Sequence, residues 1–169
     1  MKIGIISDTH GRDLPREVFE LFAGVDFILH AGDILTTSTL DELRAIAPVE
    51  AVAGNIDSTD TVNDLGRKKV ISAGSTKIGL IHGDVGSGGN TPERARRAFE
   101  AERVDVVVFG HSHQPLIRQV GSVLLVNPGS ATDPRQQVQP SVALLHIGPP
   151  LAAEILLLPR RALRTSLDV

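Results

Sequence analysis

The residues best suited to chemistry are four histidines, two aspartates and one asparagine, gathered in five short polar clusters. Imidazole nitrogens with carboxylate and amide oxygens, in a chain that has no cysteine, suit divalent cations of hard to borderline character. One ion rarely takes more than about six ligands, so this number of candidates, with one carboxylate free to bridge, predicts a pair of ions. The clusters are Asp8-Thr9-His10, Gly32-Asp33, Gly54-Asn55, His82-Gly83 and Gly110-His111-Ser112-His113.

Each cluster directly follows an apolar run that predicts a β-strand. Taken alone, every cluster also fits an ordinary turn, in which polar side chains satisfy backbone groups. In open α/β sheets, however, the loops beyond the carboxyl ends of the strands converge on the ligand site. We therefore expect the five clusters to meet in space although they are far apart in the sequence.

Short apolar runs alternate with amphipathic segments in the first half of the chain, a pattern typical of strands joined by crossover helices. Helices are predicted over residues 14–22 and 40–46, and a third begins at Pro92 behind a Thr91 cap. After residue 109 only hairpins follow, which predicts an antiparallel C-terminal half. The predicted strands are 2–6, 26–30, 49–53, 70–73, 77–81, 105–109, 116–120, 123–126, 142–147 and 153–158.

These elements predict a mixed α/β (α+β) sandwich in a single domain that spans residues 1–169. A chain of this length can bury roughly two-thirds of the surface that its unfolded form exposes, so it needs no covalent staples. With five Phe and neither Trp nor Tyr, the core must consist of Val, Ile, Leu and Ala, which suit buried strands.

Composition excludes several classes of protein. The start of the chain, Met-Lys-Ile-Gly-Ile-Ile-Ser-Asp, is interrupted too early by Asp8 for a secretory signal or a membrane span, so we expect a cytoplasmic protein with no membrane partner. A net charge of −3 and a pI near 6.0 do not indicate a nucleic-acid patch. The edge strands of the hairpin-rich half could pair with a second copy, which makes a homodimer one alternative.

The ordered series D-x-H, G-D, G-N-x-D, H-G and G-H-x-H resembles the calcineurin-like metallophosphoesterases. The later Asn127-Pro128-Gly129-Ser130, followed by Pro134-Arg135, resembles the small bacterial and archaeal phosphodiesterase branch in particular. The match runs in the family's order from Asp8 to Arg135. The resemblance implies two mixed β-sheets packed face to face and flanked by helices.

The resemblance also implies which side chains hold which ion. Asp8, His10 and His113 would hold one ion, and Asn55, His82 and His111 the other, with Asp33 bridging both. The ions would be Mn²⁺, with Fe, Ni, Zn or Co as alternatives. Two divalent ions outweigh the two carboxylates and a bridging hydroxide, so the site would keep a positive charge facing an anionic ester.

The activity implied is hydrolysis of a small phosphodiester by in-line attack of the metal-bridging hydroxide, with Asp33 and Asn55 as the catalytic positions. One departure concerns the leaving group, since much of the family has His after the Asn of G-N-x-D, where this chain has Ile56. Isoleucine cannot transfer a proton, so we expect a preference for esters with good leaving groups. Asp57 and Asp84 are candidate replacements for the acid, with structural hydrogen bonding as the alternative role.

Four residues outside the ligand set need a role. His30 lies at a strand end beside the site and could orient a ligand or simply pack. Asn127 and Arg135 could contact the substrate or support the ligands, because Arg binds phosphate bidentately. His146 lies inside an apolar run and is expected to be structural.

Two other functions compete with phosphodiester hydrolysis. The eukaryotic retromer subunit that resembles this fold is a protein-binding scaffold, but it departs at the position of His10, which is intact here. A phosphomonoesterase or a nuclease would keep the metals and change the pocket. Ile56 argues against the first, and the modest charge argues against the second.

Overall fold

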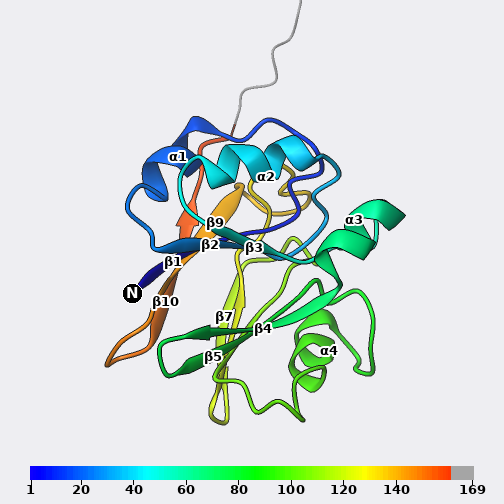
Figure 1. Cartoon of the computed structure of the whole chain (residues 1–169), viewed down its shortest axis with the longest axis vertical. Helices are drawn as coiled ribbons and strands as arrows, with labels where there is room; N and C mark the ends of the chain where they lie inside the picture. The colour runs from blue at the N-terminus through cyan, green and yellow to red at the C-terminus, as the bar shows by residue number, and fades with distance from the viewer. Residues whose placement is uncertain (161–169) are drawn as a thin grey trace, which may run out of the picture.

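The computed structural model describes residues 1–160, in which two five-stranded sheets pack face to face with helices outside them (Figure 1). The predicted sandwich of two mixed sheets flanked by helices is confirmed. The elements in chain order are β1 (Lys2–Ile6), α1 (Arg16–Leu21), β2 (Phe27–His30), α2 (Thr37–Arg44), β3 (Val49–Ala51), α3 (Thr59–Leu65), β4 (Lys68–Ala73), β5 (Thr76–Ile81), α4 (Thr91–Arg97), β6 (Val106–Val108), β7 (Leu116–Val120), β8 (Val123–Asn127), β9 (Ser141–His146) and β10 (Ala152–Leu157). The strand orders are β10-β9-β1-β2-β3 and β4-β5-β6-β8-β7.

Strand β1 shows how the side chains divide between the layers. Ile3 and Ile5 lie in the central core, where they meet apolar residues of β5, β6 and β8 from the other sheet. Ile6 points the opposite way, into a second core beneath α1 and α2. A third core lies between α4 and the outer face of the second sheet. Because side chains alternate along a strand, a continuous apolar run is buried on both faces.

The outer face of each sheet has a glycine on which a phenylalanine ring rests. A Cβ on Gly4 of β1 would lie 3.1 Å from the ring of Phe22, and one on Gly79 of β5 would lie 2.7 Å from the ring of Phe99. Both rings are buried. The missing side chains therefore let the segments that follow α1 and α4 pack close to their sheets.

The prediction of an antiparallel C-terminal half is wrong for the centre of the second sheet. Strand β6 runs parallel to both β5 and β8, and only the β4–β5 and β7–β8 pairs are antiparallel there. The hairpins themselves were correctly predicted. The strand next to hairpin β7–β8 was not correctly predicted. The hairpin joins the sheet through its second strand, β8, which runs parallel to β6.

Two helical features also differ from the sequence-based prediction. Helix α3 was not predicted, since none of its residues is buried and it therefore lacks an apolar stripe. Its signal was the Ser58 cap, whose side chain accepts a hydrogen bond from Thr61 N. The cap of α4 is Asn90, which accepts from Glu93 N, and Thr91 is the first helical residue.

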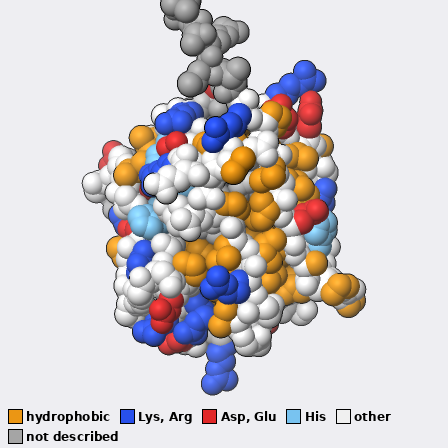
Figure 2. All heavy atoms as spheres, turned by 180° about the vertical axis from the view of Figure 1, so that it is seen from behind, with side chains coloured by type: hydrophobic (Ala, Val, Ile, Leu, Met, Phe, Trp, Pro, Cys, Tyr) orange, Lys and Arg blue, Asp and Glu red, His pale blue; other side chains and the backbone are white. Residues whose placement is uncertain are grey.

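Apolar side chains also reach the surface. Seen from behind, they form a broad band between groups of charged side chains (Figure 2). The edge strands β7 and β10 expose Ile117, Val120 and Leu157. The homodimer remains a prediction, to which these edges give a candidate surface. Across residues 1–160, no helix is both long and apolar enough to cross a membrane.

The contact between Gly79 and Phe99 makes a testable prediction. Gly79→Ala should lower the free energy of unfolding by about 1–3 kcal/mol, because the new methyl group overlaps a buried ring. Urea denaturation followed by circular dichroism measures the loss. Gly148→Ala is the matched control, since its Cβ would meet nothing within 4 Å. An equal change in both variants would contradict the close packing of α4 on β5.

Candidate metal centre

The five polar clusters lie at the carboxyl ends of five parallel-sheet strands, three in one sheet and two in the other. Backbone hydrogen bonds tie the loops together. Asp8 N donates to Gly32 O and His10 N to Asp33 O, both at 3.0 Å, and Gly110 N donates to His82 O at 3.0 Å. The loops that follow these strands therefore converge in the structure, as expected for loops at the carboxyl ends of neighbouring strands.

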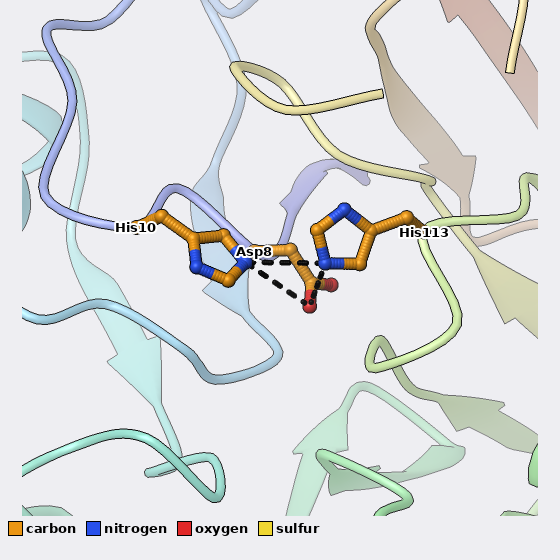
Figure 3. Close-up of side chains that lie close together, drawn as sticks. All are labelled: Asp8, His10 and His113. Carbon is orange, nitrogen blue, oxygen red and sulfur yellow. Dashed lines mark hydrogen bonds and ion pairs between the residues drawn. The ribbon is translucent and has the colours of Figure 1, made fainter. Parts of the chain in front are cut away.

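The first group of side chains is formed by Asp8, His10 and His113 (Figure 3). Nε2 of His113 lies 3.2 Å from Oδ1 of Asp8 and 3.1 Å from Nε2 of His10. Nε2 of His10 lies 4.0 Å from the same carboxylate oxygen. Asp8 is completely buried, and its Oδ1 accepts no hydrogen bond from any residue in the described part of the chain.

Two of these three separations fit a metal ion, and the one between His10 and Asp8 is longer, at 4.0 Å. Two ligand atoms that are each about 2.1 Å from an ion lie about 3–3.5 Å apart. A buried carboxylate oxygen without a hydrogen bond is costly unless a cation balances its charge. The first group therefore has the donor atoms, the spacing and the uncompensated charge that a divalent ion requires.

The second group contains the other four candidates. Nε2 of His82 lies 3.3 Å from Oδ2 of Asp33 and 3.2 Å from Oδ1 of Asn55. Nδ1 of His111 lies 3.1 Å from the same oxygen of Asn55. Asp8, Asp33 and His82 also have ligand atoms within 4.8 Å of one another. Since Asp33 and Asp8 lie this close, the two groups are adjacent, with Asp33 on the side of the second.

Backbone carbonyls fix the orientation of two histidines. Nδ1 of His82 donates to Ala31 O at 2.7 Å, and Nδ1 of His113 donates to Asp133 O. A carbonyl oxygen can only accept, so in each ring Nδ1 carries a proton, and when the ring is neutral Nε2 keeps a lone pair. In the neutral ring, each Nε2 thus points its lone pair toward the other ligands of its group, and this is the form in which imidazole binds metals.

An unusual backbone conformation presents the ligands. Outside glycine, positive φ is uncommon and costs of order 1–3 kcal/mol per residue, and such strain clusters at functional sites. Here it turns the side chains at the strand ends inward. The candidate ligands with positive φ are Asp8 (54°), His10 (53°), Asp33 (56°), His111 (65°) and His113 (56°).

Two glycines leave room for the carboxylates. A Cβ on Gly54 would overlap Oδ1 of Asp33, and a Cβ on Gly110 would overlap Ser7 Oγ and Oδ2 of Asp8. The glycines in the G-N and G-H motifs are thus required by the close approach of the neighbouring loop.

The histidines differ in how their surroundings affect their protonation. Burial acts to lower the pKa of His82, but the hydrogen bond with Asp33 and the charge of Asp8 outweigh it and leave the pKa raised. Burial likewise acts to lower the pKa of His113, but the neighbouring Asp8 outweighs it and leaves the pKa raised. Burial instead holds the pKa values of His10 and His111 below the ordinary value. The carboxylates thus stabilise positive charge within each group.

Asp57 and Asp84 do not have the surroundings of a general acid. Oδ1 of Asp57 accepts from Ile34 N at 2.8 Å and Leu35 N at 2.7 Å, and its Oδ2 accepts from Gly54 N at 2.7 Å. Its carboxylate therefore positions the loops that present Asp33 and Asn55. Asp84 is paired with Arg67 at 3.1 Å. These contacts favour the structural alternative at both positions.

The remaining candidates also take structural places. Asn127 is buried, donates to Gly110 O and Ser112 Oγ, and accepts from Gly129 N, so it orders the G-H-x-H loop. His146 of β9 pairs with Glu154 of the neighbouring strand β10. Arg135 is exposed, and its contact with substrate remains a prediction.

Sequence reasoning missed two serines that hold Asp8. Ser7 Oγ donates to Oδ2 of Asp8 at 2.6 Å, and Ser130 Oγ donates to Asp8 O at 2.7 Å. Only the N-P-G-S motif hinted at Ser130. A backbone N–H, that of His111, also donates to Oδ2 of Asp8.

A comparison with known sequences identifies the family. The profile of the calcineurin-like phosphoesterase superfamily domain matches residues 1–148. The chain belongs to this superfamily. A probable metallophosphoesterase of Methanothermobacter thermautotrophicus is 42% identical over 161 residues, which cover 92% of each chain. A phosphodiesterase of Methanocaldococcus jannaschii is 30% identical over 145 residues, which cover 76% of this chain and 83% of that one.

Solved structures of the same fold include a phosphodiesterase and Vps29. An archaeal phosphodiesterase aligns with a TM-score of 0.76 at 25% identity, over 94% of this chain and all of that one. Vps29 of Entamoeba histolytica in complex with Zn²⁺ aligns with a TM-score of 0.75 at 26% identity, over 92% of this chain and 98% of that one. The calcineurin-like phosphoesterase fold of this chain is thus shared by a phosphodiesterase and by Vps29.

The buried His30 predicts a pH dependence of stability. Its ring donates to or accepts from Thr9 Oγ1 at 3.0 Å and accepts from Gly32 N at 3.3 Å, so both nitrogens are engaged in the neutral form. Burial lowers its pKa from 6.5 to about 4. Because the folded pKa is depressed, this stability is present above pH 6.5 and is lost as the pH falls toward 4.

His30→Gln keeps a donor and an acceptor but does not titrate. Between pH 7 and pH 5, the metal-free parent protein should lose about 2 kcal/mol more of its free energy of unfolding than the variant does. Urea titrations at the two pH values measure this difference. Equal losses would show that His30 is not buried in its neutral form.

Proposed function

We propose that this chain is a phosphodiesterase that works with two divalent metal ions, Mn²⁺ being the expected metal. The observation that carries the proposal is the convergence of seven nitrogen and oxygen donors from five strand ends around the buried Asp8. Asp8, His10 and His113 would hold one ion, and Asn55, His82 and His111 the other. Asp33, which lies near both groups, would bridge them.

Each residue has a separate part in the proposed reaction. When bound, two divalent ions supply Lewis acidity and lower the pKa of a coordinated water. Asp33 is held for its role by His82 and by Ile56 N, which donates to its Oδ1 at 3.2 Å. Asn55 points its amide oxygen at His82 and His111, which leaves its Nδ2 free to donate to a phosphoryl oxygen of the substrate.

The leaving group would depart without a proton from a side chain. Ile56 occupies the position after Asn55 and is 43% exposed at the rim, where it offers no proton. The nearby carboxylates of Asp57 and Asp84 are held by backbone amides and by Arg67. Diesters with an acidic leaving group, such as aryl esters, are therefore the favoured substrates.

The scaffold hypothesis has one point in its favour, the fold shared with Vps29. A scaffold has no use for five strained, inward-turned ligand residues around a buried carboxylate, so we prefer the enzyme. The phosphomonoesterase and nuclease alternatives would share the metals, and substrate comparisons separate them.

Metal titration tests the proposal. Metal-stripped protein should hydrolyse bis(p-nitrophenyl) phosphate only after Mn²⁺ is added, and should bind close to two ions per chain. His10→Ala and His111→Ala should each lose one ion and at least about 100-fold in kcat, because ligands from separate groups are removed. Hydrolysis is followed by absorbance and bound metal by mass spectrometry.

His146→Ala is the matched control, since this exposed histidine pairs with Glu154 and belongs to neither ligand group. It should keep both ions and full activity. Two bound ions without turnover of any phosphoester would favour the scaffold, and full activity in His10→Ala would refute the ligand assignment.

The role of Ile56 gives a second prediction. Ile56→His restores a side chain that can donate a proton to the leaving oxygen, so turnover of esters with poor leaving groups should rise relative to bis(p-nitrophenyl) phosphate. The ratio of phenyl to p-nitrophenyl phosphodiester turnover measures this. Ile56→Gln, which is polar but cannot supply the proton, is the control. An unchanged ratio would remove the basis of the leaving-group argument.

A further inference from the structure

A pocket of about 360 Å³ lies beside the candidate metal centre, between the start of α4 and β7. Two arginines, Arg94 of α4 and Arg118 of β7, line it, together with polar groups such as Ser112 and Gln114. Its lining contains no carboxylate. The pocket thus carries two positive charges in a chain whose net charge is −3.

Residues 1–160 contain eleven arginines, six of which lie within 4.0 Å of a carboxylate. Arg94 and Arg118 belong to the five that have no such partner there, and they are the two that line this pocket. The side chain of Arg118 also makes no hydrogen bond to any residue of 1–160. Two guanidinium groups that share a pocket repel each other unless an anion lies between them.

The guanidinium of Arg94 is held in place by neutral partners. Its Nε donates to Gly83 O at 3.1 Å and its Nη2 donates to Thr91 Oγ1 at 3.0 Å. These acceptors fix the plane of the group but do not neutralise it, and its other N–H groups remain available. A fixed planar fork of this kind matches the oxygens of phosphate.

The pocket is connected to the candidate metal centre through two loops. Ser112, which lines the pocket, stands between the ligands His111 and His113, and Gly83, which accepts from Arg94, follows the ligand His82. A substrate phosphate at the metals could therefore extend over the G-H-x-H loop and place another group in the pocket.

We propose that this pocket binds a second, terminal phosphate of the substrate. The substrate class would then be a phosphodiester that carries a further phosphomonoester, as in a nucleotide esterified at one phosphate and free at another. A terminal phosphate fits two guanidinium groups better than a carboxylate does, because it brings about twice the negative charge. This inference rests on the proposed function.

Two chromogenic substrates that differ by one phosphate test the inference. They are thymidine 5′-(p-nitrophenyl phosphate) and the same ester with a 3′-phosphate. The Mn²⁺-loaded protein should show a kcat/KM about tenfold or more higher for the phosphorylated ester, as expected for charge-assisted hydrogen bonds to one phosphate. Arg118→Gln should remove most of this preference and leave the unphosphorylated ester within about twofold.

Arg96→Gln is the matched control, because Arg96 lies on the same helix but pairs with Glu100 and does not line the pocket. Arg118 carries the decisive test, since it is exposed and its loss should not affect folding. Equal kcat/KM for both esters, or a loss in Arg118→Gln that is the same for both, would overturn the inference.

Failure of the proposed function gives a different result, namely no hydrolysis of either ester. Calorimetry then still decides the inference. Thymidine 3′,5′-bisphosphate should bind the Mn²⁺-loaded protein about tenfold tighter than thymidine 5′-monophosphate, and Arg118→Gln should abolish the difference. Equal affinities would refute the phosphate pocket whatever the protein catalyses.

Discussion

The buried carboxylate of Asp8 is the feature on which the site depends. One of its oxygens is held by Ser7 and by the backbone of His111, while the other faces His10 and His113 without a hydrogen bond from the described chain. A buried carboxylate in this state requires a cation nearby. Because Asp8 follows the central strand of one sheet and His111 follows a central strand of the other, balancing this charge also ties the two sheets together at their common edge.

The fold supplies this arrangement at a cost in backbone strain. Five candidate ligands have positive φ, and glycines at 54 and 110 allow neighbouring loops to approach the carboxylates. Three well-packed apolar cores offset the strain, since the strands that carry the ligands are buried on both faces. The ligands are thereby held before any metal binds, which reduces the entropy lost on binding.

Sequence patterns predicted the clusters at the strand ends because apolar runs and polar residues alternate in the chain itself. They could not predict that β8 lies beside β6, since a hairpin does not specify which of its strands joins the sheet. They could not separate acid from structural roles for Asp57, because two of its three backbone donors, Ile34 and Leu35, come from a loop distant in sequence. The sequence also could not predict that Arg94 and Arg118 line the same pocket, because only the packing of α4 near β7 brings them together.

Anomalous diffraction from crystals grown with Mn²⁺ would test the central claim most directly, because it locates the ions independently of activity. The account predicts two peaks, one among Asp8, His10 and His113 and the other among Asn55, His82 and His111, with Asp33 in contact with both. A single peak, or peaks away from these side chains, would contradict the dinuclear centre.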